Sequence, residues 1–282
     1  MLDYKVRTFL TLCKYMNYRI SAEKLNMAQP SVTQHIHLLE DYYSTKLFIY
    51  NKKTLIKTDS AKILEKHLRS IVDNEKELER ELQNTKIKEI KIGVTKTIGN
   101  YVLKDKIISL INDKSSITYI IDNTKALFDK LNENILDLLV IEGLFDKSLY
   151  DYKLFRNEEI VGICTKNHIF ANKEIDLKDI FTQGLLLREE GSGTRNILEQ
   201  ELFKKNYTIN SFKTVHFISS FEIIKDVIRK SQYITFAYKS ILNDSNELST
   251  FSIKDINIDR EFNYVCLKNT NIEKKILNFY QS

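Results

Sequence analysis

Cysteine is scarce in this chain of 282 residues, and long apolar runs are absent. The three cysteines, Cys13, Cys164 and Cys266, form no C-x-x-C pair, which argues against a disulfide framework or a zinc site. Buried, inert thiols are the favoured interpretation, with a redox role for Cys164 or Cys266 left open. Because there is no membrane-length apolar run and no secretion signal, we expect a cytoplasmic protein. Neither a metal nor a cofactor is predicted.

Glycine and proline are missing from most of the first third of the chain. All seven glycines lie at Gly93 or later, and Pro30 is the only proline. The 92 residues before Gly93 are rich in Leu, Lys and Glu and are therefore predicted to be mostly helical. Beyond Gly93, short β-prone runs alternate with helical patterns, as in βαβ units. The expected fold is α+β overall, with a helical N-terminal part and an α/β body.

The chain carries a formal charge of +5, and the excess lies at one end. Residues 1–58 hold nine Lys and Arg against four Asp and Glu, whereas the 34 charges of each sign after them cancel. A small basic segment on a neutral body suits binding to a phosphate backbone, because neutralised phosphates release condensed counterions. A solvated basic face without a partner is the alternative that charge alone leaves open.

The basic segment begins with three short predicted helices. An apolar stripe at helical spacing predicts the first over residues 3–16. The second is expected to begin near Ser21, with the hydroxyl as its N-cap, and residues 26–28 form the turn that follows. Pro30 then suits the first position of the third helix, where a missing N–H costs nothing. Two short helices joined by a tight turn predict a helix-turn-helix, whose second helix enters the major groove.

The third helix has an apolar face and a polar face. Val32, Ile36 and Leu39 fall on one side and should pack on the first two helices. The other side offers side chains that hydrogen-bond bases and phosphates. With Pro30 at the helix start, the predicted DNA contacts there are Gln29, Pro30, Ser31, Thr33, Gln34 and His35.

Two β-prone runs follow the third helix and enclose a basic turn. They cover residues 47–50 and 54–57, with Asn51, Lys52 and Lys53 between them. This pattern predicts a hairpin, the wing of a winged helix-turn-helix, with Lys52, Lys53 and Lys57 near the DNA backbone. A helical bundle with a polar surface is the less favoured alternative.

A long helix is predicted over residues 59–86. Leucine and isoleucine recur at spacings of three and four, as in the seam of a two-stranded coiled coil, with Glu75 as the polar position. A dimer suits two identical heads that grip two half-sites, whereas a helix packed on its own domain is the alternative. The predicted seam residues are Leu64, Leu68, Ile71, Leu78 and Leu82.

The first 86 residues resemble LysR-type transcriptional regulators. The family's head motifs appear in order and spacing as residues 22–25 (AEKL), 28–33 (AQPSVT), 36–40 (IHLLE) and 47–48 (LF). The chain departs from the family at Ser44, where Gly is usual, at Tyr50, where Arg is usual, and at Lys57-Thr58, where Leu-Thr is usual. The loss of the wing arginine weakens any transfer of its phosphate contact, for which Lys52 and Lys53 could substitute.

The resemblance implies three parts: a DNA-binding head over residues 1–58, a dimerising linker helix over 59–86 and an effector-binding body over 87–282. It further implies that the body has two lobes, like periplasmic binding proteins, around a hinged cleft. The strand and helix pattern agrees with βαβ units. Lobe one is expected to hold residues 87–160 and 265–282, and lobe two residues 161–264.

Two turns stand out as places where an effector could bind. Thr95-Lys96-Thr97 follows the first body strand and opens a helix, a position that favours anions. Ser192-Gly193-Thr194 precedes another helical pattern, and its small residues leave backbone N–H groups accessible. The resemblance places both turns, and Glu142 at the end of a strand, in the effector cleft. Ordinary helix capping is the alternative for each hydroxyl.

An enzyme is not expected. The sequence around Ser192 is not G-x-S-x-G, no histidine has a catalytic partner at a motif spacing, and Walker and G-x-G-x-x-G loops are absent. We predict a sequence-specific DNA-binding transcriptional regulator, a homodimer or homotetramer, controlled by a small anionic metabolite. The alternative is a regulator whose body recruits a protein partner, with RNA polymerase as one candidate. Neither the effector nor the target genes follow from the sequence.

Overall fold

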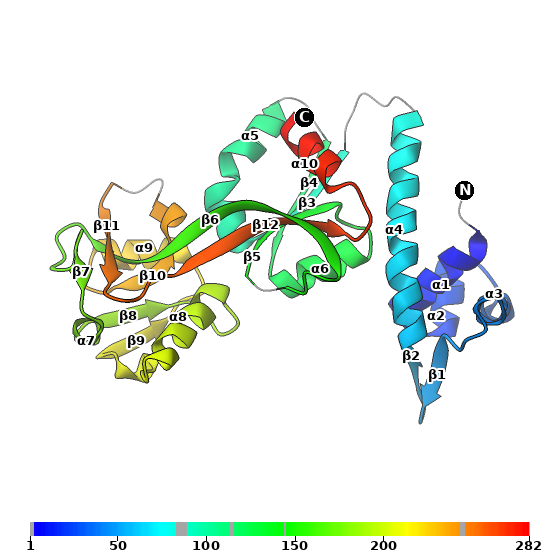
Figure 1. Ribbon diagram of the computed structural model, residues 1–282, viewed down its shortest axis with the longest axis horizontal. Helices are drawn as coiled ribbons and strands as arrows, with labels where there is room; N and C mark the ends of the chain where they lie inside the picture. The colour runs from blue at the N-terminus through cyan, green and yellow to red at the C-terminus, as the bar shows by residue number, and fades with distance from the viewer. Residues whose placement is uncertain (1–2, 83–88, 113–115, 144, 243–245, 282) are drawn as a thin grey trace.

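The computed structural model describes residues 3–82, 89–112, 116–143, 145–242 and 246–281. A small head, one long helix and a two-lobed body follow one another along the chain, and the long helix stands between the head and the body (Figure 1). The predicted fold class, a winged helix-turn-helix followed by a linker helix and an α/β body, is confirmed. Among the described helices, none is long and apolar enough to cross a membrane.

The head consists of three helices and a hairpin. Its elements are α1 (Tyr4–Tyr15), α2 (Tyr18–Leu25), α3 (Gln29–Tyr43), β1 (Phe48–Asn51) and β2 (Thr54–Lys57). Asp3 caps α1 by accepting the backbone N–H of Lys5, and Asn26 ends α2 in a left-handed conformation. Val32, Ile36 and Leu39 are buried on α3, as the helical spacing predicts. The strands pair antiparallel from Phe48 with Lys57 to Asn51 with Thr54.

The start predicted for the second helix is wrong. The helix begins at Tyr18, because the side chain of Asn17 accepts the backbone N–H of Ile20 at 3.1 Å and caps the first turn. Ser21 lies inside the helix and is buried, with its backbone N–H bonded to the carbonyl of Asn17. A capping side chain can be recognised from sequence, but Asn17 and Ser21 compete for that role, and only the packing decides between them.

The long helix α4 (Asp59–Leu82) begins where the wing ends. The Thr58 hydroxyl accepts the backbone N–H of Ala61 at 3.1 Å and so caps its first turn. Residues 83–86 of the predicted helix lie outside the described residues. Leu68, 6% exposed, belongs to the apolar core of the head, and Leu64 packs against that core.

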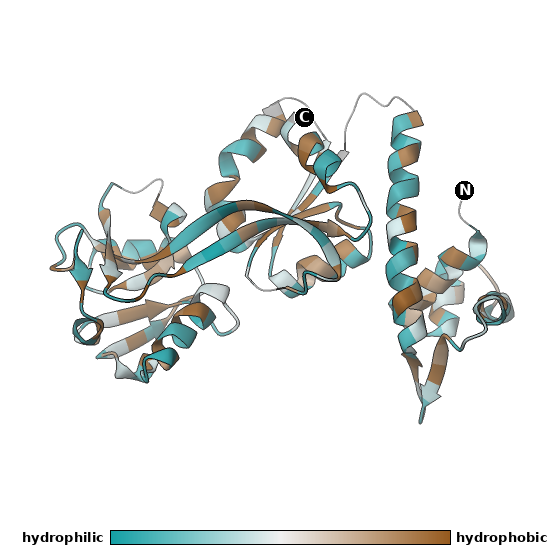
Figure 2. Cartoon of the chain, viewed as in Figure 1, coloured by the Kyte–Doolittle hydropathy of each residue, from teal (hydrophilic) through white to brown (hydrophobic). Residues whose placement is uncertain are grey.

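The predicted seam therefore needs a correction at its N-terminal end. Leu64 and Leu68 share the helical period of the seam but are used inside the chain, because the head folds back over the first turns of α4. Ile71, Leu78 and Leu82 remain exposed along the rest of the helix. Figure 2 shows apolar residues interspersed among hydrophilic ones along α4.

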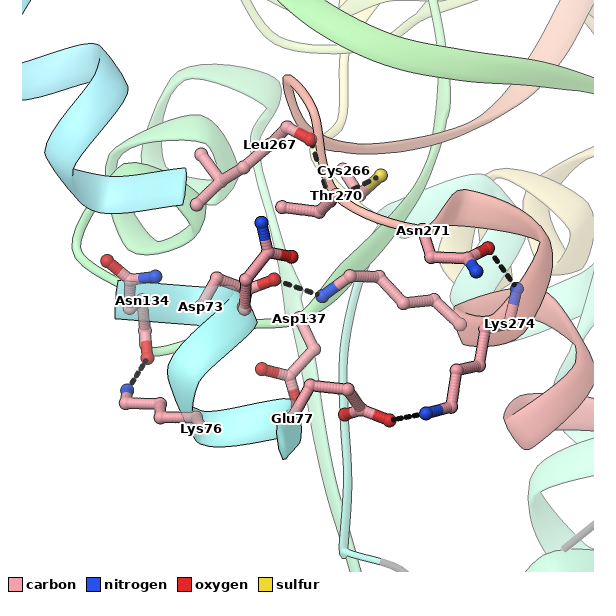
Figure 3. A network of polar contacts seen from close by, with 12 residues as sticks. Asp73, Lys76, Glu77, Asn134, Asp137, Cys266, Leu267, Thr270, Asn271 and Lys274 are labelled. Carbon is pink, nitrogen blue, oxygen red and sulfur yellow. Dashed lines mark hydrogen bonds and ion pairs between the residues drawn. The ribbon is translucent and has the colours of Figure 1, made fainter. Parts of the chain in front are cut away.

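The opposite face of α4 is docked on the body through polar contacts (Figure 3). The Lys275 ammonium donates to the Asp73 carboxylate at 2.8 Å, and the two side chains are 14% and 7% exposed. Lys274 pairs with Glu77 at 2.8 Å and also contacts Glu81. We call these five residues the linker clasp. The spacing of four between Asp73, Glu77 and Glu81 lines up three carboxylates on one helical face.

The body is built on one mixed sheet and a smaller one. The order of the large sheet is β4-β3-β5-β12-β6-β11-β7, with β10 also paired to β6, while β8 and β9 form a parallel pair. The strands are β3 (Glu89–Thr95), β4 (Ser116–Asp122), β5 (Leu138–Glu142), β6 (Tyr150–Thr165), β7 (Glu174–Ile175), β8 (Gly184–Leu187), β9 (Thr214–Phe217), β10 (Thr235–Tyr238), β11 (Leu248–Ile253) and β12 (Asp259–Leu267).

Helices cover the sheets of both lobes. The helical stretch that follows Thr95-Lys96-Thr97 is divided: a π-helical turn, η1 (Ile98–Val102), precedes α5 (Lys104–Asn112). The other helical elements are α6 (Thr124–Asn132), α7 (Leu177–Ile180), α8 (Gly193–Lys204), η2 (Ile209–Ser211), α9 (Phe221–Arg229), η3 (Lys239–Leu242) and α10 (Ile272–Gln281). The last helix, α10, packs on lobe one and buries Phe279 fully.

Two antiparallel strands, β6 and β12, join the lobes (Figure 1). Asp259 pairs with Glu159 near lobe two, and Leu267 pairs with Tyr150 in lobe one. The chain therefore returns through residues 259–262, earlier than the boundary near Val265 that the sequence suggested. The alternation of apolar and polar side chains identifies a strand but not the strands beside it. The sequence therefore does not show that one strand takes part in both lobes. The joining stretches are largely hydrophilic (Figure 2).

Candidate functional sites

The N-terminal half of α3 forms an exposed polar face on the head. Gln29, Pro30 and Gln34 are exposed, and Ser31 and Thr33 are half-buried. The Thr33 hydroxyl donates to the carbonyl of Gln29 at 3.2 Å and is thereby held against its own helix. The free amides of Gln29 and Gln34 are the groups on this face best suited to base edges.

His35 has a structural partner that the sequence did not suggest. Its Nδ1 lies 2.8 Å from the Thr8 hydroxyl, so the imidazole ties α3 to α1 and is half-buried. Further along the face, the structure adds His37, Leu38 and Asp41, which line a shallow depression with Gln29 and Gln34. Periodicity alone could have found them, because they continue the same helical stripe.

The wing lysines divide into two kinds. Lys52 and Lys53 are exposed at the tip of the hairpin, where Lys52 adopts a positive φ of 58° that closes the tight turn. Lys57, by contrast, is paired with Glu65 of α4 at 2.7 Å. The tip lysines are therefore available to phosphates, while Lys57 fixes the wing to the linker helix.

A cavity of about 540 Å³ lies between the two lobes. Lobe one contributes η1 and the start of α5, and lobe two contributes the residue after β8 and the start of α9. The lining residues are Lys96, Asn100, Tyr101, Lys104, Arg188, Ser219, Ser220, Phe221 and Glu222. Of these, sequence reasoning identified only Lys96.

Two contacts join the lobes across this cavity. The Tyr101 hydroxyl donates to the Glu222 carboxylate at 2.9 Å, and the Lys96 ammonium donates to the Glu189 carboxylate at 3.3 Å. The Lys225 ammonium pairs with Glu222 at 2.9 Å and lies 4.8 Å from the centre of the Tyr101 ring. Although burial opposes ionisation, the ammonium and the phenol hydroxyl lower the pKa of Glu222.

Arg188 is the buried cation of the cavity, with a side chain only 7% exposed. Its guanidinium lies 4.6 Å from the centre of the Phe221 ring and bonds both carboxylate oxygens of Glu189, at 2.7 and 2.9 Å. Although burial opposes ionisation, this pairing lowers the pKa of Glu189 to about 2. Arg188 directly follows the buried strand β8, so its place at a strand end was the signal that could have found it.

Thr95, Thr97 and Glu142 lie together at the strand ends of lobe one. The buried Thr95 hydroxyl donates to the Glu142 carboxyl, which also bonds the Thr97 side chain. Burial raises the pKa of Glu142 to about 7, and a backbone hydrogen bond, the bond to Thr97 and the Arg188 charge only partly oppose the rise. This carboxyl therefore exchanges its proton near neutral pH.

Ser192, Gly193 and Thr194 lie together at the start of α8 in lobe two. The Ser192 and Thr194 hydroxyls are 3.0 Å apart, and neither residue lines the cavity. Ser192 occupies the N-cap position without a side-chain capping bond. The residues that sequence reasoning missed in lobe two follow another strand, at Ser219-Ser220 before α9, where the same kind of signal is present in the sequence.

All three cysteines are buried, as predicted. Burial raises the pKa of the Cys164 and Cys266 thiols to about 11 and raises that of Cys13 further. Thiols in this state are poor nucleophiles, because the thiolate is the reactive form.

Two family models match the chain and together cover most of it. The model described as "Bacterial regulatory helix-turn-helix protein, lysR family" matches residues 4–62. The model described as "LysR substrate binding domain" matches residues 83–282.

Known proteins resemble the chain over most of its length. The HTH-type transcriptional regulator CysL of Bacillus subtilis (strain 168) is 26% identical over 269 residues, 92% of this chain and 89% of that protein. A full-length OxyR variant of Pseudomonas aeruginosa has a TM-score of 0.67 at 18% identity, covering 100% of this chain and 94% of that one. The CcmR regulatory domain of Synechocystis PCC6803, in complex with 2-PG, has a TM-score of 0.57 at 19% identity, covering 68% and 96%. At such identities the structures show a shared fold.

Proposed function

The chain belongs to the LysR family of transcriptional regulators, and we propose that a small anionic metabolite bound between its two lobes controls how it holds DNA. It is a DNA-binding regulator with an effector-binding domain. In the proposal, a cytoplasmic homodimer or higher homo-oligomer grips an inverted-repeat operator with paired heads, through the Gln29 and Gln34 amides and the Lys52 and Lys53 ammonium groups.

The buried guanidinium of Arg188 is the observation that carries the effector proposal. It is held in place by Phe221 and Glu189 and borders a cavity that three lysine and arginine side chains line against one carboxylate, that of Glu222. An anionic ligand would replace the Glu189 carboxylate as the partner of Arg188 and Lys96, and would compete with Glu222 for the Tyr101 hydroxyl. Because those two carboxylates also join the lobes, a ligand that displaces them would change the lobe arrangement.

Recruitment of a protein partner by the body, for instance RNA polymerase, remains the rival. A cleft filled with apolar side chains would favour that rival. The charged and hydroxyl-bearing lining between the lobes instead favours a small polar ligand, which such a cleft can surround.

Isothermal calorimetry on the full-length protein tests the effector proposal. A panel of small phosphorylated and carboxylated metabolites, with 2-PG included because the CcmR regulatory domain was solved with it, is expected to contain a binder. Arg188→Met should weaken its binding roughly tenfold to a hundredfold, since a hydrogen bond to a charged group is lost. Lys213→Met, an exposed change in the same lobe, should leave the affinity unchanged. If every compound failed to bind, the rival would be favoured.

The head is tested separately by binding to an inverted-repeat operator fragment. Gln34→Ala should weaken specific binding, because an exposed amide able to read a base edge is removed. His35 is left intact, since its bond to Thr8 makes any substitution a test of head stability as well. Equal operator affinity for Gln34→Ala and the wild type would show that α3 does not read the sequence.

A further inference from the structure

A second cavity, of about 590 Å³, lies where the head, the linker helix and lobe one meet. The head contributes Lys14 to its lining, α4 contributes Lys66 and Arg69, and lobe one contributes Tyr150 and Leu267. No part of the inter-lobe cavity is shared, because none of the residues that line one lines the other. We call this space the junction cavity.

Positive charge prevails among the residues that line the junction cavity. Six lysine and arginine side chains line it, against three carboxylates. Five of these cations form ion pairs. Lys14 pairs with Glu133 at 2.9 Å, and the single carboxylate of Glu65 is shared between Lys57 at 2.7 Å and Arg69 at 2.6 Å. One negative charge there compensates two positive ones. The other two pairs are Lys62 with Asp59 at 2.8 Å and Lys268 with Asp151 at 3.1 Å, whose carboxylates do not line the cavity.

Lys66 is the lining cation that forms no ion pair with any of the described carboxylates. It lies half-buried on α4, and its charge acts on the Asp146 carboxylate without forming an ion pair with it. A half-buried ammonium loses part of its hydration without gaining a counter-charge, so an anion beside it would be favoured. The neighbouring Arg69 is itself buried and adds a fixed guanidinium.

Part of the remaining wall is apolar and aromatic. Leu149 and Leu267 line it together with Tyr150, whose hydroxyl is 3.0 Å from the Asn132 amide. A cavity of this size with one charged side and one apolar side suits a small molecule that joins an acidic group to an aromatic or short aliphatic part.

We propose that the junction cavity is a second ligand site, for an amphipathic small anion such as an aryl phosphate, and that its occupancy fixes the head relative to the body. All three parts of the chain supply walls, so the site exists only while α4 is docked through the linker clasp. A ligand there stabilises the docked arrangement by mass action. This site goes beyond the effector cleft and acts on the head without passing through the hinge between the lobes.

Dimerisation along the predicted seam would leave the junction cavity open. Successive residues of a helix turn by about 100°, which puts Lys66 and Arg69 on the side of α4 that faces the body. Ile71 and Leu78 then lie on the opposite side, where they are exposed. A second helix against that side would not reach the cavity.

Calorimetric titration of the full-length protein with phenyl phosphate tests the proposal, with phenol and inorganic phosphate as the two halves of the probe. The wild type should bind phenyl phosphate more tightly than either half. Lys66→Gln should weaken binding about tenfold, because its charge-assisted contact is lost, and Lys66→Arg should retain most of it. Lys96→Gln, at the inter-lobe cavity, should leave this binding unchanged.

Coupling to the clasp supplies a second measurement. Asp73 lines neither cavity, but Asp73→Asn weakens the docking of α4 on the body. The variant should therefore also lower the affinity for phenyl phosphate. Equal affinities for Lys66→Gln and the wild type, or loss of binding in Lys96→Gln instead, would overturn the site. No binding by the wild type would overturn the ligand class, and full affinity in Asp73→Asn would overturn the coupling.

Discussion

Glu142 offers a direct test of how the cleft is built, through the substitution Glu142→Gln. The carboxyl is half-buried at the strand ends of lobe one, accepts the Thr95 hydroxyl and bonds Thr97, and burial raises its pKa from 4.5 to about 7. Because it holds its proton more tightly in the folded chain than in the unfolded one, the free energy of unfolding falls as pH rises from about 4.5 to about 7. The free-energy cost of the buried carboxylate charge is fully present above pH 7 and is absent well below pH 4.5.

The size of this change in the free energy of unfolding follows from the difference between the two pKa values of Glu142. A change from 4.5 to about 7 corresponds to about 3 kcal/mol, at about 1.4 kcal/mol for each pH unit. This figure is an upper limit, because Glu142 keeps part of its surface in contact with water. Glutamine has nearly the same shape and can still accept the Thr95 hydroxyl, so it removes the charge without opening a cavity.

Chemical denaturation of wild type and Glu142→Gln at pH 5 and pH 8, followed by circular dichroism, measures the difference. At pH 5 the two proteins should differ by less than about 1 kcal/mol, and at pH 8 the variant should be the more stable by about 2–3 kcal/mol. Glu261→Gln, an exposed carboxylate on β12, serves as the matched control without such a pH-dependent gain. A difference between Glu142→Gln and wild type that does not change with pH would refute the reasoning.

Three further predictions concern the head and the linker helix. Lys52→Ala should weaken binding to all DNA sequences alike and reduce the slope of log affinity against log salt by about 1, measured by fluorescence anisotropy; an unchanged slope would remove the wing tip from the interface. Glu40→Ala should cost the head about 2–3 kcal/mol at pH 7 in thermal unfolding, because its buried carboxylate accepts the Leu47 N–H at 2.9 Å. Although burial opposes it, pairing with Lys46 lowers the pKa of Glu40, so this contribution is present above pH 4.5 and should be lost as pH falls through the lowered value. Lys275→Met should destabilise the protein more than Asp73→Asn, because the Lys275 charge also acts on a second carboxylate, that of Asp137. Equal melting temperatures for the two variants would contradict this account of the linker clasp.

Much of the head was predictable from its residues. Its helix spacing, its single proline and the basic turn between two β-prone runs are local signals, and local signals need no knowledge of distant partners. The roles of single polar side chains were not predictable in the same way. His35 bonds Thr8, and Lys57 pairs with Glu65, because folding brings together side chains that sequence separates.

The cleft was less accessible to sequence reasoning. Thr95 and Thr97 were found as residues between a strand and a helix, but Arg188, Tyr101 and Glu222 gain their meaning only from facing one another across two lobes. The boundary between the lobes was hard to predict for a related reason, because β12 pairs with β5 in lobe one and continues toward lobe two as the same strand. Pairing partners in a sheet are set by long-range packing.

By itself, the sequence determined the parts of this protein: a basic winged head, a long helix with an apolar period, and an α/β body. Hydrophobic period, helix caps and charge balance act within a few residues of one another, so they are written locally. Only the tertiary structure decided which surfaces these parts leave open. Leu64 and Leu68 have the period of a seam but pack in the core of the head. Asp73 pairs with Lys275, about two hundred residues away in the sequence. Lys66 lines a cavity and forms no ion pair with any carboxylate in the part of the chain that the structure describes. Burial and pairing depend on the whole fold, and they determine which groups can still bind a ligand.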